Sequence, residues 1–246
     1  MPQLAPGLGD WPALALVGLS FLTSLITATF SLGGGSLMIA AMTLVLPPVV
    51  VVPVHGCVQL GSNAGRAMLM RAHIQWQFIL WVALGAALGS MLGGRFATLL
   101  PERWFAAAIG LFVLVTTWLP QPKAMAGSRV VQFAGGAVVS AVGMVVGAAG
   151  PLVAAFVRGI TDRRELVATH AMLNTLVHVF KVAVFVAMGF AFAQYLPLVL
   201  VMVIAGLAGT AIGSRLLTRI PEQVFRLVFR LLLSVIGLEL LRRALD

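Results

Sequence analysis

Charge is scarce in this 246-residue chain, because only 9% of its residues are Asp, Glu, Lys or Arg while 61% are hydrophobic. Soluble domains carry about 25% charged residues, so the composition excludes a soluble globular protein. Apolar runs long enough to span a bilayer as helices recur from Trp11 to the C-terminus. Alternating strands of about ten residues, which would indicate a membrane β-barrel, do not occur. We therefore expect an all-α polytopic membrane protein in contact with the lipid bilayer.

Cysteine is also rare, and the N-terminal residues include no basic side chain. Cys57 is the single cysteine, which excludes an intramolecular disulfide and argues against a thiolate metal site. The first eleven residues, MPQLAPGLGDW, contain no Lys or Arg, so they lack the basic start of a cleaved signal peptide. The first apolar segment is therefore interpreted as a permanent span.

The few charges are mostly basic, with 16 Lys and Arg against 7 Asp and Glu. The basic residues stand singly between apolar segments, as expected if most of them fix the orientation of the spans in the membrane. This pattern does not predict a nucleic-acid partner.

The chain contains an internal duplication. The stretch HGCVQLGSNAGR (55–66) aligns with HAMLNTLVHVFK (170–181), and the glycine turns before them, at Gly35 and Gly150, align at the same offset of 115. Further along, GSMLGGR aligns with GTAIGSR at an offset of 120. The sequence thus predicts two homologous transmembrane repeats, 1–125 and 126–246, within one membrane domain.

Each repeat is expected to contain five helical segments. Their approximate ranges are 12–32, 35–47, 50–70, 77–98 and 102–120, then 130–147, 150–160, 164–187, 192–216 and 222–243. The second segment of each repeat is short and follows a glycine turn, with Ser36 expected as the N-cap of one and Pro151 as the first residue of the other. Short, glycine-interrupted segments at matching places in two halves are typical of transporter binding sites.

The distribution of basic residues favours ten crossing segments with both termini outside. That arrangement puts nine basic residues inside and four outside, whereas eight spans with re-entrant short segments give eight against five at best. An odd number of segments per repeat would also make the two copies inverted, a common plan among transporters.

Each repeat carries a stripe of polar residues on one helix face. The first stripe is His55, Gln59, Asn63 and Arg66, and the second is His170, Asn174, His178 and Lys181. In each the spacing is 4, 4 and 3 residues, which places the four side chains on one face along about 16 Å of helix. Polar residues inside a span usually face a bundle interior or a watery cavity. The alternative is that the amides only join helices, at about 0.6 kcal/mol each.

Two cations end these stripes without a nearby acid. Of the seven acids only Glu239 falls well inside a predicted span. Arg66 and Lys181 therefore have no acidic partner nearby, which favours a bound anion unless their side chains extend to the membrane interface. The N–H groups at the glycine turns would also favour an anion. The predicted substrate-binding residues are His55, Gln59, Asn63, Arg66, His170, Asn174, His178, Lys181, Gly34, Gly35, Ser36 and Gly150; no metal site and no cofactor is predicted.

Other glycines are expected to serve packing alone. Gly85, Gly89 and Gly93, with Gly209 and Gly213 in the second repeat, follow the small-xxx-small spacing that lets membrane helices approach closely.

Together these features resemble the sulfite exporter TauE/SafE family. The likeness rests on SLGGGSLMIAAMTLVLPPVVVVPVHGCVQLGSNAGRAMLMRAHIQW in the first half and on GMVVGAAGPLVAAF and HAMLNTLVHVFKV in the second. The resemblance implies a multi-pass inner-membrane transporter that exports sulfite or an organosulfonate. A homodimer is compatible with this plan.

Several alternatives remain at this point. The substrate could be another small anion, such as sulfate or a carboxylate, and transport could be uniport or coupled to protons through the histidines. A metal-cation carrier using His55, His170 and His178 is disfavoured by the neighbouring Arg66 and Lys181. An enzyme is disfavoured because the histidines have no Asp partner within a span, and a purely structural subunit would not need two cationic stripes.

Overall fold

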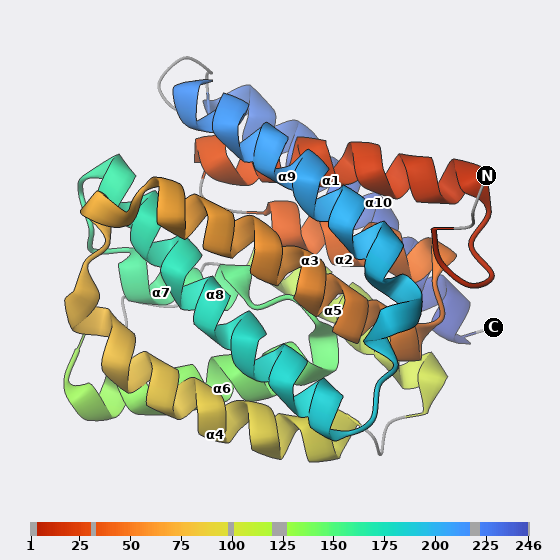
Figure 1. Ribbon diagram of the computed structural model, residues 1–246, viewed down its shortest axis with the longest axis horizontal. Helices are drawn as coiled ribbons and strands as arrows, with labels where there is room; N and C mark the ends of the chain where they lie inside the picture. The colour runs from red at the N-terminus through yellow and green to blue at the C-terminus, as the bar shows by residue number, and fades with distance from the viewer. Residues whose placement is uncertain (1–3, 31–32, 98–100, 120–126, 217–221, 246) are drawn as a thin grey trace.

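The computed structural model describes the chain except residues 1–3, 31–32, 98–100, 120–126, 217–221 and 246. The predicted boundary between the repeats, at 125 and 126, lies outside the described residues. The described residues form ten α-helices (Figure 1). In the first half these are α1 (Asp10–Phe30), α2 (Gly34–Val45), α3 (Pro48–Leu69), α4 (Ile79–Ala97) and α5 (Glu102–Trp118). In the second half they are α6 (Arg129–Val146), α7 (Gly150–Val157), α8 (Arg163–Ala187), α9 (Leu196–Leu216) and α10 (Glu222–Leu245).

The all-α polytopic fold is confirmed. All ten expected segments are present as helices, and none of the described residues forms a β-strand. Within the described parts of the chain, five helical stretches are long and apolar enough to cross a membrane: Asp10–Thr29, Trp76–Ala97, Arg129–Val146, Arg163–Ala187 and Phe192–Arg215. The short 3₁₀ helices Arg71–His73, Trp76–Phe78 and Phe192–Tyr195 lie beside the ends of the long helices.

The short helices α2 and α7 begin after glycines with left-handed backbone. Gly33 has φ of 94° and is the N-cap of α2, so the expectation that Ser36 caps this helix is wrong. Gly147 has φ of 75° and ends α6, and α7 then starts at Gly150, so Pro151 is its second residue rather than its first. L-residues with a side chain adopt this backbone at a cost of about 1–2 kcal/mol, which explains why glycine stands at both breaks.

The long helix α8 starts at a conventional cap. The carboxylate of Asp162 accepts hydrogen bonds from the backbone N–H groups of Glu165 and Arg164. These bonds hold the pKa of Asp162 below its ordinary value, the bond from Glu165 contributing most. They also satisfy two of the N–H groups that a helix start leaves unpaired.

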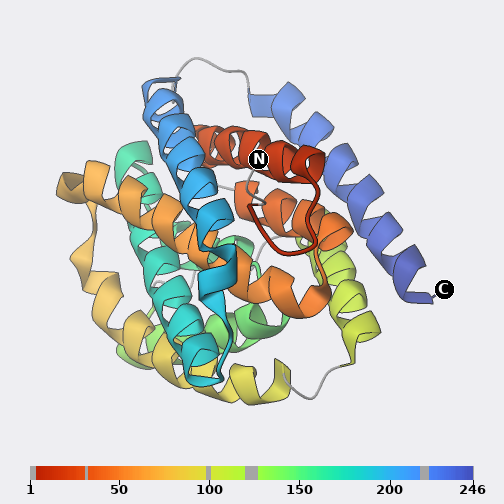
Figure 2. The same ribbon diagram turned by 45° about the vertical axis from the view of Figure 1, so that its right-hand side comes forward.

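Helices from the two halves pack against one another in equivalent pairs. The main pairs are α1 with α9, α4 with α6, α3 with α8 and α5 with α10. In Figures 1 and 2 the α1–α9 pair and the α4–α6 pair lie on opposite sides of the α3–α8 pair. The first helix of each half therefore packs on the fourth helix of the other half.

Glycines explain how closely the outer pairs approach. A Cβ on Gly89 would overlap the backbone of Ala137 in α6, and a Cβ on Gly209 would overlap the backbone of Phe21 in α1. Gly93 and Gly213, one turn further on, approach Ala141 and Leu25 in the same way. The predicted close-packing role of these glycines is confirmed, and Gly85 has it too.

The central helices α3 and α8 run in opposite directions. His55, near the start of α3, lies beside His178 in the second half of α8, whereas Ala67, near the end of α3, packs with Ala168 near the start of α8. The two polar stripes therefore face each other head to tail between the outer pairs.

Candidate functional site

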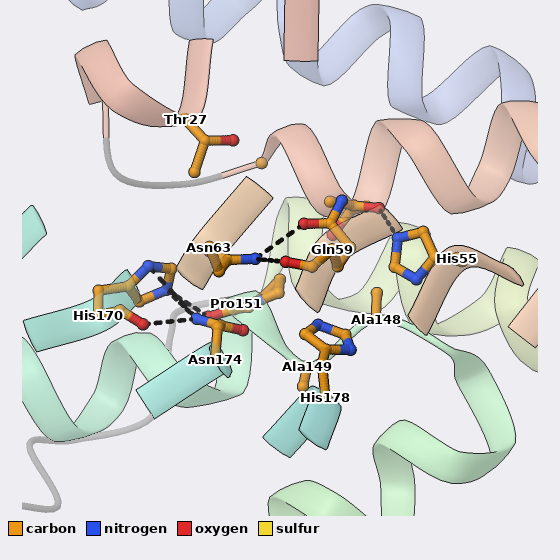
Figure 3. Close-up of a pocket in the computed structure, with 14 residues that line it drawn as sticks. Thr27, His55, Gln59, Asn63, Ala148, Ala149, Pro151, His170, Asn174 and His178 are labelled. Atoms are coloured by element: carbon orange, nitrogen blue, oxygen red, sulfur yellow. Dashed lines mark hydrogen bonds between the residues drawn. The ribbon is translucent and has the colours of Figure 1, made fainter. Parts of the chain in front are cut away.

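A cavity lies between the two halves where both stripes meet both glycine turns (Figure 3). It is lined by His55, Gln59 and Asn63 of α3, His170, Asn174 and His178 of α8, Gly33, Gly35 and Ser36 at the first turn, Ala148, Ala149, Gly150 and Pro151 at the second turn, and Thr27 of α1. The free space inside it is small, about 20 Å³, roughly what one water molecule needs, so the cavity is nearly closed in this structure.

Two histidines hold the glycine turns in the same way. Nε2 of His55 lies 3.1 Å from the carbonyl oxygen of Gly35, and Nε2 of His170 lies 3.1 Å from that of Gly150. Each pair spans twenty residues. Because a carbonyl oxygen can only accept, each Nε2 carries a proton and donates it to the turn. These two histidines therefore fix the position of the turns, and the Nε2 atoms are not free for a ligand.

The amide side chains of the stripes are partly committed to local bonds. Asn63 donates through Nδ2 to the backbone oxygen of Gln59 at 2.8 Å and to its Oε1 at 3.0 Å. Asn174 donates through Nδ2 to the backbone oxygen of His170 at 2.9 Å. The Nε2 of Gln59 has no hydrogen bond among the described residues and lies close to Gly35, since a Cβ built there would be 3.5 Å from it. Gln59 therefore offers the clearest side-chain donor of α3 to the cavity.

Some buried polar atoms at the cavity have no partner among the residues that the structure describes. They are Oγ of Ser36, Nδ1 of His55 and Nδ1 of His178. The rings of His55 and His178 meet edge to face, with centroids 5.9 Å apart. Unpartnered polar atoms in a buried site are costly and usually indicate a bound ligand or water.

The two stripe cations lie behind the cavity rather than at its surface. Of the described residues, none of those lining the cavity is Lys or Arg. Arg66 donates through Nη1 to Oδ1 of Asn63 at 3.1 Å and through Nη2 to Oγ1 of Thr210 at 3.3 Å. Lys181 donates through Nζ to the carbonyl oxygen of Gly147 at 2.5 Å. Each cation thus contacts a group next to the cavity.

Both cations are enclosed by protein, with 2% of Arg66 and 1% of Lys181 exposed. They therefore do not extend to the membrane interface, which was the alternative interpretation. Within the described part of the chain, no carboxylate lies within ion-pair distance of either cation. Two buried, uncompensated positive charges make the adjoining cavity favourable for an anion.

The glycines of the turns differ in what they contribute. Gly34 is absent from the cavity surface, because it packs on α1, where a Cβ would overlap Oγ1 of Thr27 and the backbone of Thr23. Gly35 and Gly150 line the cavity and have ordinary backbone angles; the described glycines with positive φ include Gly33 and Gly147 instead. Neither position therefore needs glycine for its backbone conformation, and a side chain there would enter the cavity.

The structure thus brings nine of the twelve predicted site residues to one cavity and places Arg66, Lys181 and Gly34 just outside it. Sequence reasoning missed Thr27 and Thr210. Thr27 lies four residues after Thr23 in an otherwise apolar helix, and its Oγ1 bonds back to the Thr23 carbonyl, a pattern that gives no functional signal. Thr210 follows the packing glycine Gly209 and was aligned with Ser90 in GSMLGGR, but its contact with Arg66 depends on the pairing of α3 with α9.

The described residues contain no group of three or more His, Cys, Asp or Glu side chains arranged to hold a metal ion. The side-chain donors that remain available at the cavity are Nε2 of Gln59 and Oγ of Ser36.

Comparison with known protein families identifies the family of the chain. The model of the sulfite exporter TauE/SafE family matches residues 16–240, which is nearly the whole chain. The protein belongs to this family of membrane transporters of sulfite and related sulfur-containing anions. No curated protein and no solved structure matches the chain.

Proposed function

We propose that the protein exports a small sulfur-containing oxyanion, sulfite or an organosulfonate, through the cavity between α3 and α8. The observation that carries this proposal is the meeting of both polar stripes and both glycine turns at one cavity, with two uncompensated cations behind it. Family membership supports the general class of substrate.

The anion would be bound by neutral donors and stabilised by charge at a distance. Nε2 of Gln59, Oγ of Ser36 and the backbone N–H groups at the start of α2 face the cavity from the first half. The N-terminus of a helix also carries partial positive charge, which favours an anion. Since Arg66 and Lys181 act without touching the anion, binding stays weak enough for release, as transport requires.

Export follows from the membrane potential. With the cytoplasm negative, each negative charge that leaves gains about 2.3 kcal/mol per 100 mV. A divalent anion gains about twice that, which sustains a concentration ratio of roughly a thousandfold without a coupling ion. Uniport in the inner membrane is therefore sufficient for export.

We further propose that the two repeats are inverted copies related by a twofold axis in the membrane plane. The antiparallel packing of α3 on α8 and the exchanged pairs α1–α9 and α4–α6 support such an axis. The ten helices would then all belong to the crossing bundle, with both termini outside. Rocking of one repeat against the other would expose the cavity to each side in turn.

A flux assay on purified protein in lipid vesicles tests this function. Vesicles loaded with sulfite, methanesulfonate, sulfate or acetate are given an interior-negative potential, and the efflux of each anion is measured. We expect sulfite or methanesulfonate to leave fastest. Gln59→Leu should reduce the rate by about tenfold, whereas Gln77→Leu, at an exposed glutamine that does not line the cavity, should not. Equal, background-level efflux of all four anions would contradict the proposal.

A further inference from the structure

Ser90 is buried to 1% exposure in α4, and its hydroxyl has no partner among the described residues. A polar atom left unpaired in the protein interior calls for an explanation. Ser90 aligns with Thr210 at the offset of 120 that relates GSMLGGR to GTAIGSR. Thr210 is also buried to 1% exposure, but its hydroxyl receives a hydrogen bond from Arg66.

The surroundings of the two hydroxyls are equivalent. Along α3 and α9, Gly61 faces Val203 and Gly65 faces Leu207, so the two helices run in the same direction up to the Arg66–Thr210 contact. The corresponding pair in the other half is α8 with α4, which also pack together. Lys181 of α8 aligns with Arg66 at the offset of 115.

Contacts along α4 and α8 put Ser90 at the level of Lys181. Ile79 at the start of α4 packs with the cluster of Ala168 and Ala171, and Gly94 near its end faces Val184. Ser90 precedes Gly94 by one turn, and Lys181 precedes Val184 by about one turn. Lys181 nevertheless donates to Gly147 at the glycine turn of its own half.

The two equivalent cations are thus used differently in this structure. Arg66 bonds to the hydroxyl of the neighbouring α9, which belongs to the other half, while Lys181 bonds to its own turn and leaves the hydroxyl of α4 unpaired. Inverted copies that alternate between two shapes exchange such contacts between the halves.

We propose that Thr210 and Ser90 are positioning residues for the two buried cations and are occupied alternately during transport. In the state seen here Arg66 donates a hydrogen bond to Thr210. In the opposite-facing state Lys181 moves from Gly147 to Ser90, and Arg66 no longer bonds to Thr210. The move of Lys181 removes one of the contacts that hold the second glycine turn, at Gly147, while the loss of the Thr210 contact removes the hydrogen bond that joins Arg66 of α3 to α9. This inference rests on the proposed transport function.

The test compares Thr210→Val, Ser90→Ala and the conservative Thr210→Ser in vesicles with known orientation. The apparent KM for sulfite is measured from each face, and the ratio of the two values reports which face the cavity prefers. Removing one anchor destabilises one state only, so Thr210→Val and Ser90→Ala should shift this ratio in opposite directions. We expect each variant to change the ratio by about tenfold, which corresponds to the lower end of what a hydrogen bond to a charged group contributes. Thr210→Ser should keep the wild-type ratio.

The outcomes separate the two proposals. Absence of anion flux in the wild type would contradict the transport function itself. Wild-type flux with both ratios unchanged, or shifted in the same direction, would overturn the alternating anchors alone. Should Thr210→Val fail to fold, Ser90→Ala still decides, because it removes an atom that has no partner here and an unchanged ratio would refute its role.

Discussion

Nε2 of His55 donates to the carbonyl oxygen of Gly35 at 3.1 Å, and twenty residues separate the two. His170 and Gly150 repeat this relationship in the second half at the same distance and separation. The two bonds hold the starts of α2 and α7 against the stripe helices α3 and α8, and so determine the shape of the cavity between them.

These bonds predict that His55 acts through Nε2. In His55→Gln the side-chain amide can donate to Gly35 from nearly the same position, so we expect most of the anion flux to remain. His55→Ala removes the donor from a fully buried site and should lower flux by about tenfold or more, with a loss of about 1–3 kcal/mol in stability from the unpaired carbonyl. Vesicle flux and thermal unfolding measure the two effects. Equal flux in both variants would contradict a positioning role.

Replacing the buried cations should separate function from stability. Arg66→Gln or Lys181→Gln removes positive charge from beside the cavity, and we expect anion flux to fall by about tenfold or more. Because each removed charge is buried without a carboxylate, the melting temperature should stay the same or rise. A matched control is Arg158→Gln, at an exposed basic residue away from the cavity. Wild-type flux in both site variants would show that the cations do not assist the anion.

Conservative exchange of these cations should also be costly. Arg66 uses two different nitrogens for Asn63 and Thr210, and Lys in its place cannot reproduce this planar fork. Lys181 packs tightly, since a Cβ on Gly56 would lie 3.0 Å from its Cδ, so the wider guanidinium of Lys181→Arg should fit poorly. We expect reduced flux in both variants. Full activity of Arg66→Lys would indicate that charge alone suffices.

The glycine turns should respond differently at neighbouring positions. Gly147→Ala places a side chain on left-handed backbone and against Ile39, so we expect lower stability. Gly35→Ala and Gly150→Ala keep ordinary backbone, and the atoms nearest to their Cβ positions belong to Gln59 at 3.5 Å and Asn174 at 4.0 Å. These two proteins should fold normally but show a raised KM, because the methyl group occupies the cavity. Chemical denaturation measures the stability of each variant, and flux kinetics measure its KM. Wild-type transport by Gly35→Ala would contradict the prediction.

Topology can be tested by labelling single cysteines. In a Cys57→Ser background, cysteines are placed at Gly7, Ser128 and Ala244, all within the described residues. Ten crossing helices with both termini outside predict that an impermeant reagent labels positions 7 and 244 from the outside and position 128 only from the inside. Labelling of all three from one face would favour eight spans and parallel copies.

Most of the fold could be predicted from the sequence. The repeat offsets and apolar lengths located every helix to within a few residues, because in a membrane protein the apolar span itself sets the helix. The sequence also allowed the prediction that Gln59 and Asn174 lie at one cavity, since the duplicated stripes and turns occupy equivalent places in both halves.

The positions of Arg66 and Lys181 could not be read from helical spacing. Both lie on the stripe face, but the crossing of α3 and α8 turns that end of each stripe away from the cavity, toward Thr210 of α9 in one half and Gly147 in the other. Ser36 was misplaced as an N-cap because the left-handed Gly33 lets the helix begin earlier. Contacts of this kind depend on tertiary pairing, which local sequence does not specify.

An oxyanion that binds between the two glycine turns can be located directly in a crystal. Crystals grown with selenite, an oxyanion of the same shape as sulfite whose selenium scatters anomalously, would give an anomalous peak at the bound position. We expect a peak in the cavity within hydrogen-bonding reach of Gln59 and Ser36, which weakens in Gln59→Leu. A peak elsewhere in the helix bundle, with the cavity empty at the same selenite concentration, would contradict it.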